Sequence, residues 1–156
     1  MNIVDHKETF ISQAKSLIQG EENLFANLSN LSALYNEYID DINWIGFYLL
    51  DEKNNNLVLG PFQGKVACIR IPFNKGVCGH CYTIQEAVYV EDVHKFPGHI
   101  ACDSATNSEL VIPILKKEKV VALLDIDSIS FDRFSKEEID VLIDVTNQIF
   151  NELNFE

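Results

Sequence analysis

Cys102 is the residue of this chain best placed for chemistry. It lies in a small, polar, turn-prone segment, residues 98–109, just ahead of a strongly apolar run at 110–115. A cysteine that only packs usually lies inside an apolar run, where it behaves as a small inert hydrophobe. A thiol in a polar, partly hydrated loop can ionise and react. This segment alone is equally compatible with a reactive thiol and with an exposed thiol of no consequence.

Three acids lie where they could act together with this thiol. Asp125 and Asp127 interrupt an otherwise apolar strand pattern, and their spacing of two places both carboxylates on one face. If residues 116–119 form the turn of a hairpin, Glu109 lies opposite Ile126. A shift of one residue in that register brings Glu109 opposite Asp125 or Asp127. In either register the three carboxylates lie at the same end of one hairpin.

Carboxylates this close repel one another. At least one of them is therefore expected to have a raised pKa unless a cation lies among them. Such a cluster suits a cationic ligand, or an acid that delivers a proton near neutral pH. The alternative is that the strand simply ends at Asp125 and that its acids face water.

The other cysteines are Cys68, Cys78 and Cys81. The Cys-Gly-His-Cys tetrapeptide at residues 78–81 has zinc-like spacing, but a closed structural zinc site normally has a second ligand pair of the same kind, which this chain lacks. The same tetrapeptide occurs in disulfide-isomerase-type oxidoreductases, but here Gly-Val precedes it instead of Trp, and no thioredoxin-like order surrounds it. We therefore expect no metal, and we expect Cys81 to pack in a short helix.

The composition limits the partners and the compartment. A chain of 156 residues with 47% apolar residues is long and apolar enough for one globular domain. The net charge of −12 argues against nucleic acid and against anionic membrane surfaces as partners. No secretory signal or membrane-spanning run is present, so we expect a cytoplasmic protein. In that reducing compartment the four cysteines are expected to serve packing, metal or redox chemistry.

The elements that position these residues follow from hydrophobic spacing. Residues 5–19 and 21–39 place apolar side chains at helical intervals and are predicted to be packing helices. About six strands are predicted, at residues 44–50, 57–60, 66–72, 87–93, 110–115 and 120–127. A short helix is predicted at 77–86 and a loop at 94–107, and Pro113 indicates a sheet edge or a bulge.

The end of the chain predicts a closing helix. Ser135 and Glu138 form a capping box, and the apolar face behind it consists of Ile139, Leu142, Ile143, Ile149, Phe150 and Leu153. No repeat, low-complexity tract or linker interrupts the chain. The fold class is therefore expected to be α+β, a single domain over residues 1–156 with N-terminal helices in 1–40 and, in 41–156, a mostly antiparallel sheet, the site loops and the closing helix.

Eight short blocks carry a resemblance to a known family. They are residues 43–48, 59–64, 67–73, 76–79, 91–94, 96–103, 107–109 and 124–127. In their order and spacing the chain from Trp44 onward resembles a GAF domain, and within that superfamily it is closely similar to the free methionine-(R)-sulfoxide reductases. The resemblance implies an oxidoreductase without a cofactor that repairs the free methionine pool under oxidative stress. It is also the basis for expecting the R epimer.

The resemblance also implies roles for the cysteines. Cys102 corresponds to the nucleophile, Cys68 to the principal resolving cysteine and Cys78 to an additional one. The implied cycle runs through a sulfenic acid and an intramolecular disulfide, which a thioredoxin-like donor reduces. Cys81 departs from the family, which more often has a small residue such as Ala, so Cys78 and Cys81 could compete with Cys68 as resolving thiols.

The substrate site is implied in the same way. Glu109, Asp125 and Asp127 match the acids that bind the substrate and assist proton transfer, and Trp44 lies in the aromatic strand motif near the pocket. A free amino acid brings an ammonium that these acids can pair with, whereas a residue inside a protein has an amide there. The N-terminal helices could form the face of a homodimer. The rival interpretation is a GAF module that senses a small molecule without chemistry.

Overall fold

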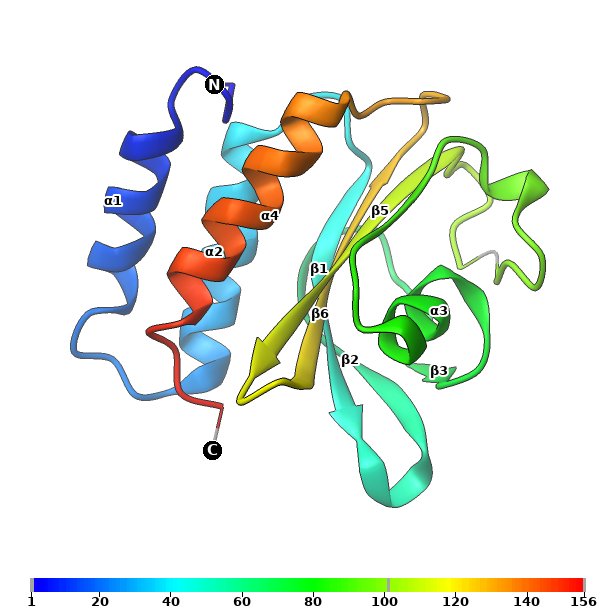
Figure 1. The fold of residues 1–156 in the computed structure, drawn as a ribbon, viewed down its shortest axis with the longest axis horizontal. Helices are drawn as coiled ribbons and strands as arrows, with labels where there is room; N and C mark the ends of the chain where they lie inside the picture. Colours follow the sequence, from blue (N-terminus) through cyan, green and yellow to red (C-terminus); the bar gives the residue numbers. More distant parts are fainter. Residues whose placement is uncertain (1, 101, 156) are drawn as a thin grey trace.

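A six-stranded antiparallel sheet divides the molecule into two layers (Figure 1). The computed structural model describes residues 2–100 and 102–155, and its strands lie in the order β3-β2-β1-β6-β5-β4. The strands are β1 (Trp44–Asp51), β2 (Asn56–Gly64), β3 (Arg70–Pro72), β4 (Val88–Val90), β5 (Ser108–Lys116) and β6 (Lys119–Ser128). The predicted mostly antiparallel sheet of about six strands is confirmed.

The three long helices lie on one side of this sheet, and the first of them packs mainly on the other two. They are α1 (Lys7–Ile18), α2 (Leu24–Tyr38) and α4 (Lys136–Phe150), and they stand together on one side of the ribbon in Figure 1. The short helix α3 (Gly76–Ile84) lies on the opposite face, with the loops that lead to β4 and β5. Two 3-10 turns, η1 (Glu52–Asn54) and η2 (Val93–Lys95), complete the elements.

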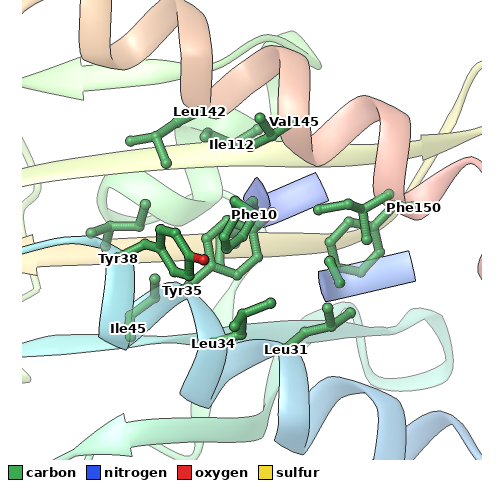
Figure 2. Packing of buried hydrophobic residues seen from close by; sticks show 14 of the residues in the cluster. Phe10, Leu31, Leu34, Tyr35, Tyr38, Ile45, Ile112, Leu142, Val145 and Phe150 are labelled. Carbon is green, nitrogen blue, oxygen red and sulfur yellow. The ribbon is translucent and has the colours of Figure 1, made fainter. Parts of the chain in front are cut away.

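Strand alternation builds a separate core on each face. Ile45 and Phe47 of β1 point toward the helices and pack with Phe10, Tyr35 and Leu142 in the cluster seen in Figure 2. The intervening residues of the same strands point the other way, because successive side chains of a strand alternate between faces. The second cluster includes Trp44, Tyr48, Val111, Leu123 and Cys78. The site is therefore built on the face that the long helices leave uncovered.

The closing helix begins as predicted, with one change at its cap. The Ser135 hydroxyl accepts a hydrogen bond from the Glu138 amide at 3.1 Å. The Glu138 carboxylate does not return to the cap. Instead it accepts two hydrogen bonds from Arg133, at 3.0 and 3.1 Å. The Ser135 half of the capping box thus forms as expected, whereas Glu138 forms an ion pair with Arg133 of the preceding loop.

Two predicted strands are shorter than expected, and one of these corrections matters for the site. The segment 66–72 was predicted as a strand containing Cys68, but only Arg70–Pro72 pairs with β2. Val66 and Ile69 are 89% and 67% exposed, so their alternation does not mark a buried face. Cys68 therefore lies in a loop. The strand predicted at 87–93 is reduced to Val88–Val90 because η2 begins at Val93.

Pro113 lies in β5, which is an interior strand of the sheet. However, β4 pairs only with residues 109–111 of β5, so Pro113 lies beyond the end of β4. On that side of β5 no strand accepts a hydrogen bond from residue 113, and proline, which has no amide proton, is tolerated there. The edge prediction is thus correct locally. The register shift of the β5–β6 hairpin falls between Ile114 and Leu115, not at Pro113.

No helix within residues 2–100 and 102–155 combines the length and the apolar character that crossing a membrane requires.

Candidate functional site

The β5–β6 hairpin brings the three acids together, one residue out of the predicted register. Leu115 pairs with Val120 as expected. The irregularity after Ile114 then shifts the rest of the ladder, so that Glu109 pairs with Asp127 instead of Ile126. Because β-strand side chains alternate, this single step places Glu109 on the same face as both aspartates.

The first strand supplies the aromatic wall beside these acids. Trp44 pairs with Asp127 from the other side, so Trp44, Asp127 and Glu109 form one row across three strands. In the next row Gly46 pairs with Asp125. A Cβ atom on Gly46 would lie 2.7 Å from Cη2 of Trp44, so the indole ring lies over this glycine. The missing side chain at residue 46 leaves room for the ring next to the acids.

A hydrogen bond and two aromatic contacts also hold the Trp44 ring in place. Its indole nitrogen donates a hydrogen bond to the Lys65 carbonyl oxygen at 3.1 Å. Its ring stacks on Phe62 with centroids 5.2 Å apart and on Tyr48 at 5.9 Å. Tyr48 in turn donates its hydroxyl proton to the Cys68 carbonyl oxygen at 2.9 Å. The aromatic wall thus positions the loop that carries Cys68.

The acids form the floor of a small cavity of about 40 Å³. Its walls come from β1, the loops before β3 and β5, and the first turn of α3. All seven residues predicted as site residues contribute to this region, although Cys68 does so through its bond to Cys102 and not as a lining residue. The cavity is lined by Trp44, Tyr48, Val66, Ala67, Ile71, Gly76, Val77, Cys78, His99, Ile100, Cys102, Asp103, Thr106, Glu109, Asp125 and Asp127.

Cys102 and Cys68 are joined by a disulfide at this cavity. Their Cα atoms lie 5.4 Å apart, and 34 residues separate them in the sequence. Both cysteines are half-buried, and each lies in a loop, before β5 and before β3 respectively. The pair that the family resemblance implied is therefore the pair that the structure bonds.

The Cys102 loop is anchored to the sheet by Asn43. The Asn43 side-chain amide donates to the Asp103 carboxylate at 2.9 Å and to the Thr106 hydroxyl at 3.1 Å. The backbone amide of Asn43 donates to the Asp127 carbonyl oxygen at 2.9 Å. One residue thus fixes the Cys102 loop relative to the acid floor. Sequence reasoning gave Asn43 no role, although it begins one of the blocks that resemble the family.

Burial and mutual repulsion govern the ionisation of the acids. Burial, followed by the charges of Asp127 and Glu109, raises the pKa of Asp125 well above its usual range. Burial and the charge of Glu109 likewise raise the pKa of Asp127. The described lining residues include no lysine or arginine that could offset this charge. The prediction that at least one carboxyl has a raised pKa is confirmed.

Cys78 faces these acids from the first turn of α3. Its sulfur and one oxygen each of Glu109 and Asp125 all lie within 4.8 Å of one another. Burial, and then the charge of Asp125, raises the pKa of the Cys78 thiol. Cys78 is therefore a protonated thiol at neutral pH that lies beside the acids.

Cys81 points away from the cavity, as expected of a packing residue. It is fully buried, and its thiol donates to the Glu86 carbonyl oxygen at 3.2 Å. Burial raises its pKa to about 12. His80 between the two cysteines is exposed, and the ring of His94 bonds to Asn107 at 2.9 Å. Within the described part of the chain, the ligands of the zinc-like tetrapeptide therefore do not converge.

Comparisons with known proteins agree with this geometry. The GAF domain family model matches residues 31–151. The chain is 52% identical over 123 residues to the free methionine-R-sulfoxide reductase of Escherichia coli strain K12, an alignment that covers 79% of this chain and 73% of that protein. The chain belongs to the free methionine-R-sulfoxide reductase family of GAF domains. The predicted α+β class and GAF fold are thereby confirmed.

Two solved structures extend the similarity over nearly the whole chain. The reduced form of fRMsr from Staphylococcus aureus is 46% identical, covers 94% of each chain and has a TM-score of 0.87. The free methionine-R-sulfoxide reductase from Neisseria meningitidis, in complex with its substrate, is 34% identical and has a TM-score of 0.89, with coverage of 97% of this chain and 90% of that one. The similarity to these two structures therefore extends over more than nine tenths of this chain.

The raised pKa of Asp125 predicts a stability effect that depends on pH. The folded protein holds a proton that the unfolded chain releases above about pH 4, so stability falls as pH rises from that value through the raised pKa. Asp125→Asn removes the buried charge. We expect it to increase the free energy of unfolding at pH 8 by about 1–3 kcal/mol, and to have much less effect at pH 5.

Urea unfolding of the disulfide-bonded protein at both pH values measures this difference. Asp140→Asn, at an exposed position of α4, is the matched control and should change stability little at either pH. An Asp125→Asn protein that is less stable than wild type at pH 8 would show that the ionised carboxylate is stabilising, contrary to this account.

Proposed function

We propose that this chain reduces free L-methionine-(R)-sulfoxide to L-methionine by thiol chemistry. The observation that carries the proposal is the disulfide between Cys68 and Cys102 at a cavity floored by Glu109, Asp125 and Asp127. The family to which the chain belongs is one of oxidoreductases, and a relative from Neisseria meningitidis has been solved with its substrate. The geometry of this chain supplies a physical reason for each step.

The acid floor selects a cationic substrate. The α-ammonium of a free amino acid can pair with the buried carboxylates, since no lysine or arginine occurs among the described residues of the lining. An amide nitrogen in a peptide carries no charge and would leave the buried anions unpaired, at a cost of several kcal/mol. Trp44 places its ring beside Asp125, where it can hold the substrate's methyl group and carbon chain. These contacts favour free methionine sulfoxide over a residue in a protein.

The first chemical step forms a bond between Cys102 and the substrate. The Cys102 thiolate attacks the sulfoxide sulfur, and one of the carboxylic acids with a raised pKa protonates the sulfoxide oxygen. Transfer of the hydroxyl group to the cysteine releases methionine, with its sulfur reduced by two electrons, and leaves Cys102 as a sulfenic acid. A carboxyl whose pKa is raised by burial is better suited to deliver this proton than an ordinary carboxyl.

The second step uses Cys68 as the resolving thiol. Its sulfur attacks the Cys102 sulfenic acid, which forms the disulfide and releases water. Cys78 is the weaker candidate for this step, since burial and the adjacent acids keep its thiol protonated. A thioredoxin-like donor then reduces the disulfide by thiol exchange, in the reducing environment of the cytoplasm. No cofactor is needed, because the two thiols supply the two electrons that reduce one sulfoxide.

The identity of the nucleophile is tested by methionine release. With dithiothreitol as the reductant, wild type is expected to convert the R epimer of free methionine sulfoxide and to leave the S epimer unchanged. Cys102→Ser should lower the rate by roughly a thousandfold or more, because a hydroxyl does not replace the thiolate. Cys81→Ser is the control and should retain activity, since Cys81 lies outside the cavity lining. Equal rates for wild type and Cys102→Ser would refute the proposed nucleophile.

The resolving role of Cys68 is tested in a single turnover. Reduced protein freed of added thiol is mixed with substrate and dimedone, and methionine and labelled protein are then quantified. Wild type should release one methionine per chain with little label, whereas Cys68→Ser should release the same amount and carry dimedone on Cys102. A Cys78–Cys102 disulfide in the variant, formed as fast as the wild-type disulfide, would transfer the resolving role to Cys78.

A further inference from the structure

The acid floor accounts for only one of the two charges of the substrate. Free methionine sulfoxide carries an α-carboxylate next to its α-ammonium, and a carboxylate enclosed beside Glu109, Asp125 and Asp127 needs hydrogen-bond donors. This question rests on the proposed function, because only an amino-acid substrate raises it. A side-chain donor for this carboxylate must come from the polar residues that line the cavity.

Most of these side chains are already engaged. The Trp44 indole nitrogen donates to the Lys65 carbonyl oxygen, and the Tyr48 hydroxyl donates to the Cys68 carbonyl oxygen. The Thr106 hydroxyl accepts from Asn43 and retains its own proton as a neutral donor. The remaining oxygen-bearing side chains of the lining are acids. No lysine or arginine occurs among the described residues that line the cavity.

His99 differs from all of these. Its side chain is half-buried and lines the cavity together with Cys102, and its Nδ1 atom is buried with no hydrogen-bond partner among the described residues. A buried imidazole nitrogen without a partner is uncommon, because such groups are normally satisfied. Imidazole can donate from Nδ1 in one neutral tautomer and in the charged form. His99 is thus the lining side chain in the described chain that can present a positively charged donor to an anion.

The loop that carries His99 is held in place on both sides. The His99 amide donates to the Phe96 carbonyl oxygen at 3.2 Å, and the Gly76 amide donates to the Gly98 carbonyl oxygen at 3.2 Å. The second bond ties the loop to the first turn of α3. Ile100 packs against Gly76 on the other side of His99, at 3.5 Å from where a Cβ atom of residue 76 would lie. These contacts hold the backbone of residue 99 at the cavity wall before a ligand arrives.

We propose that His99 binds the α-carboxylate of the substrate through Nδ1–H, while the acid floor binds the α-ammonium. The two groups together recognise the zwitterion of a free amino acid. A substrate whose carboxyl group is bound in a peptide loses the charge-assisted half of this contact.

The test compares two substrates in three variants. Free methionine-(R)-sulfoxide is compared with (R)-3-methylsulfinylpropylamine, which keeps the ammonium and the sulfoxide and lacks the carboxylate. His99→Leu should lower kcat/KM for the amino acid by about tenfold to a hundredfold, mainly through KM, and leave kcat/KM for the amine within about twofold. His99→Asn places an amide nitrogen near the position of Nδ1 and should restore part of the loss. His80→Leu, an exposed histidine of α3, is the matched control.

The outcomes separate this inference from the proposed function. If wild type reduces the amino acid and His99→Leu lowers the two kcat/KM values equally, His99 acts on folding or on Cys102, and the carboxylate assignment is overturned. If neither value falls, the carboxylate is bound by other donors, such as the first-turn amides of α3, and the assignment is overturned as well. A wild-type protein without activity on free methionine-(R)-sulfoxide overturns the proposed function itself.

Discussion

Buried negative charge is the constraint on which the rest of this structure depends. Glu109 and Asp125 are 7% and 5% exposed, and Asp127 lies between Glu109 and Trp44 in one row of the sheet. Ionised carboxylates buried this close to one another destabilise a folded protein unless a cation or a proton offsets them. The chain offers protons, through raised pKa values, and the proposed substrate offers the cation. Substrate binding and acid catalysis would thus both depend on the repulsion between these buried carboxylates.

The fold is most rigid at the strands that carry the buried acids. The acids lie on the neighbouring interior strands β5 and β6, of which β6 also pairs with β1, and both strands are backed by the helix-side core. Cys102 and Cys68 lie on loops that are hydrogen-bonded to this rigid part. The Cys102 loop is held through Asn43 and the Asn107 amide, and the Cys68 loop through Tyr48 and the Ile69 carbonyl oxygen. The proposed cycle, in which a disulfide forms and is reduced in each turnover, would use this combination of fixed acids and more mobile loops.

Much of this arrangement follows from local patterns in the sequence. Alternation alone places Asp125 and Asp127 on one face, and the polar surroundings of Cys102 distinguish it from the packing cysteine Cys81. The predicted register of the hairpin was wrong by one residue, because neither Ile114 nor Leu115, between which the irregularity falls, is a glycine, proline or other turn residue that would mark it in the sequence. Cys68 was wrongly placed in a strand, because Val66 and Ile69 have branched apolar side chains that the fold leaves exposed.

Asn43 and His99 show what local patterns do not contain. Each acts, or is proposed to act, on groups brought near by the fold, such as Asp103 for Asn43, and nothing in the neighbouring sequence distinguishes their side chains from ordinary polar residues. The roles of Cys102, Cys68 and Cys78 came from family resemblance. The physical reasons for the acid roles came from spacing and charge, and the three-dimensional arrangement supports them.

The most direct measurement of the central claim is the ratio of kcat/KM for free methionine-(R)-sulfoxide to that for its N-acetyl derivative. If the buried acids bind the ammonium, wild type should prefer the free amino acid by about a hundredfold or more, and Glu109→Gln should reduce this ratio by at least tenfold. A wild-type protein that reduces both substrates equally well would show that the acid floor does not recognise the ammonium, and would contradict the account.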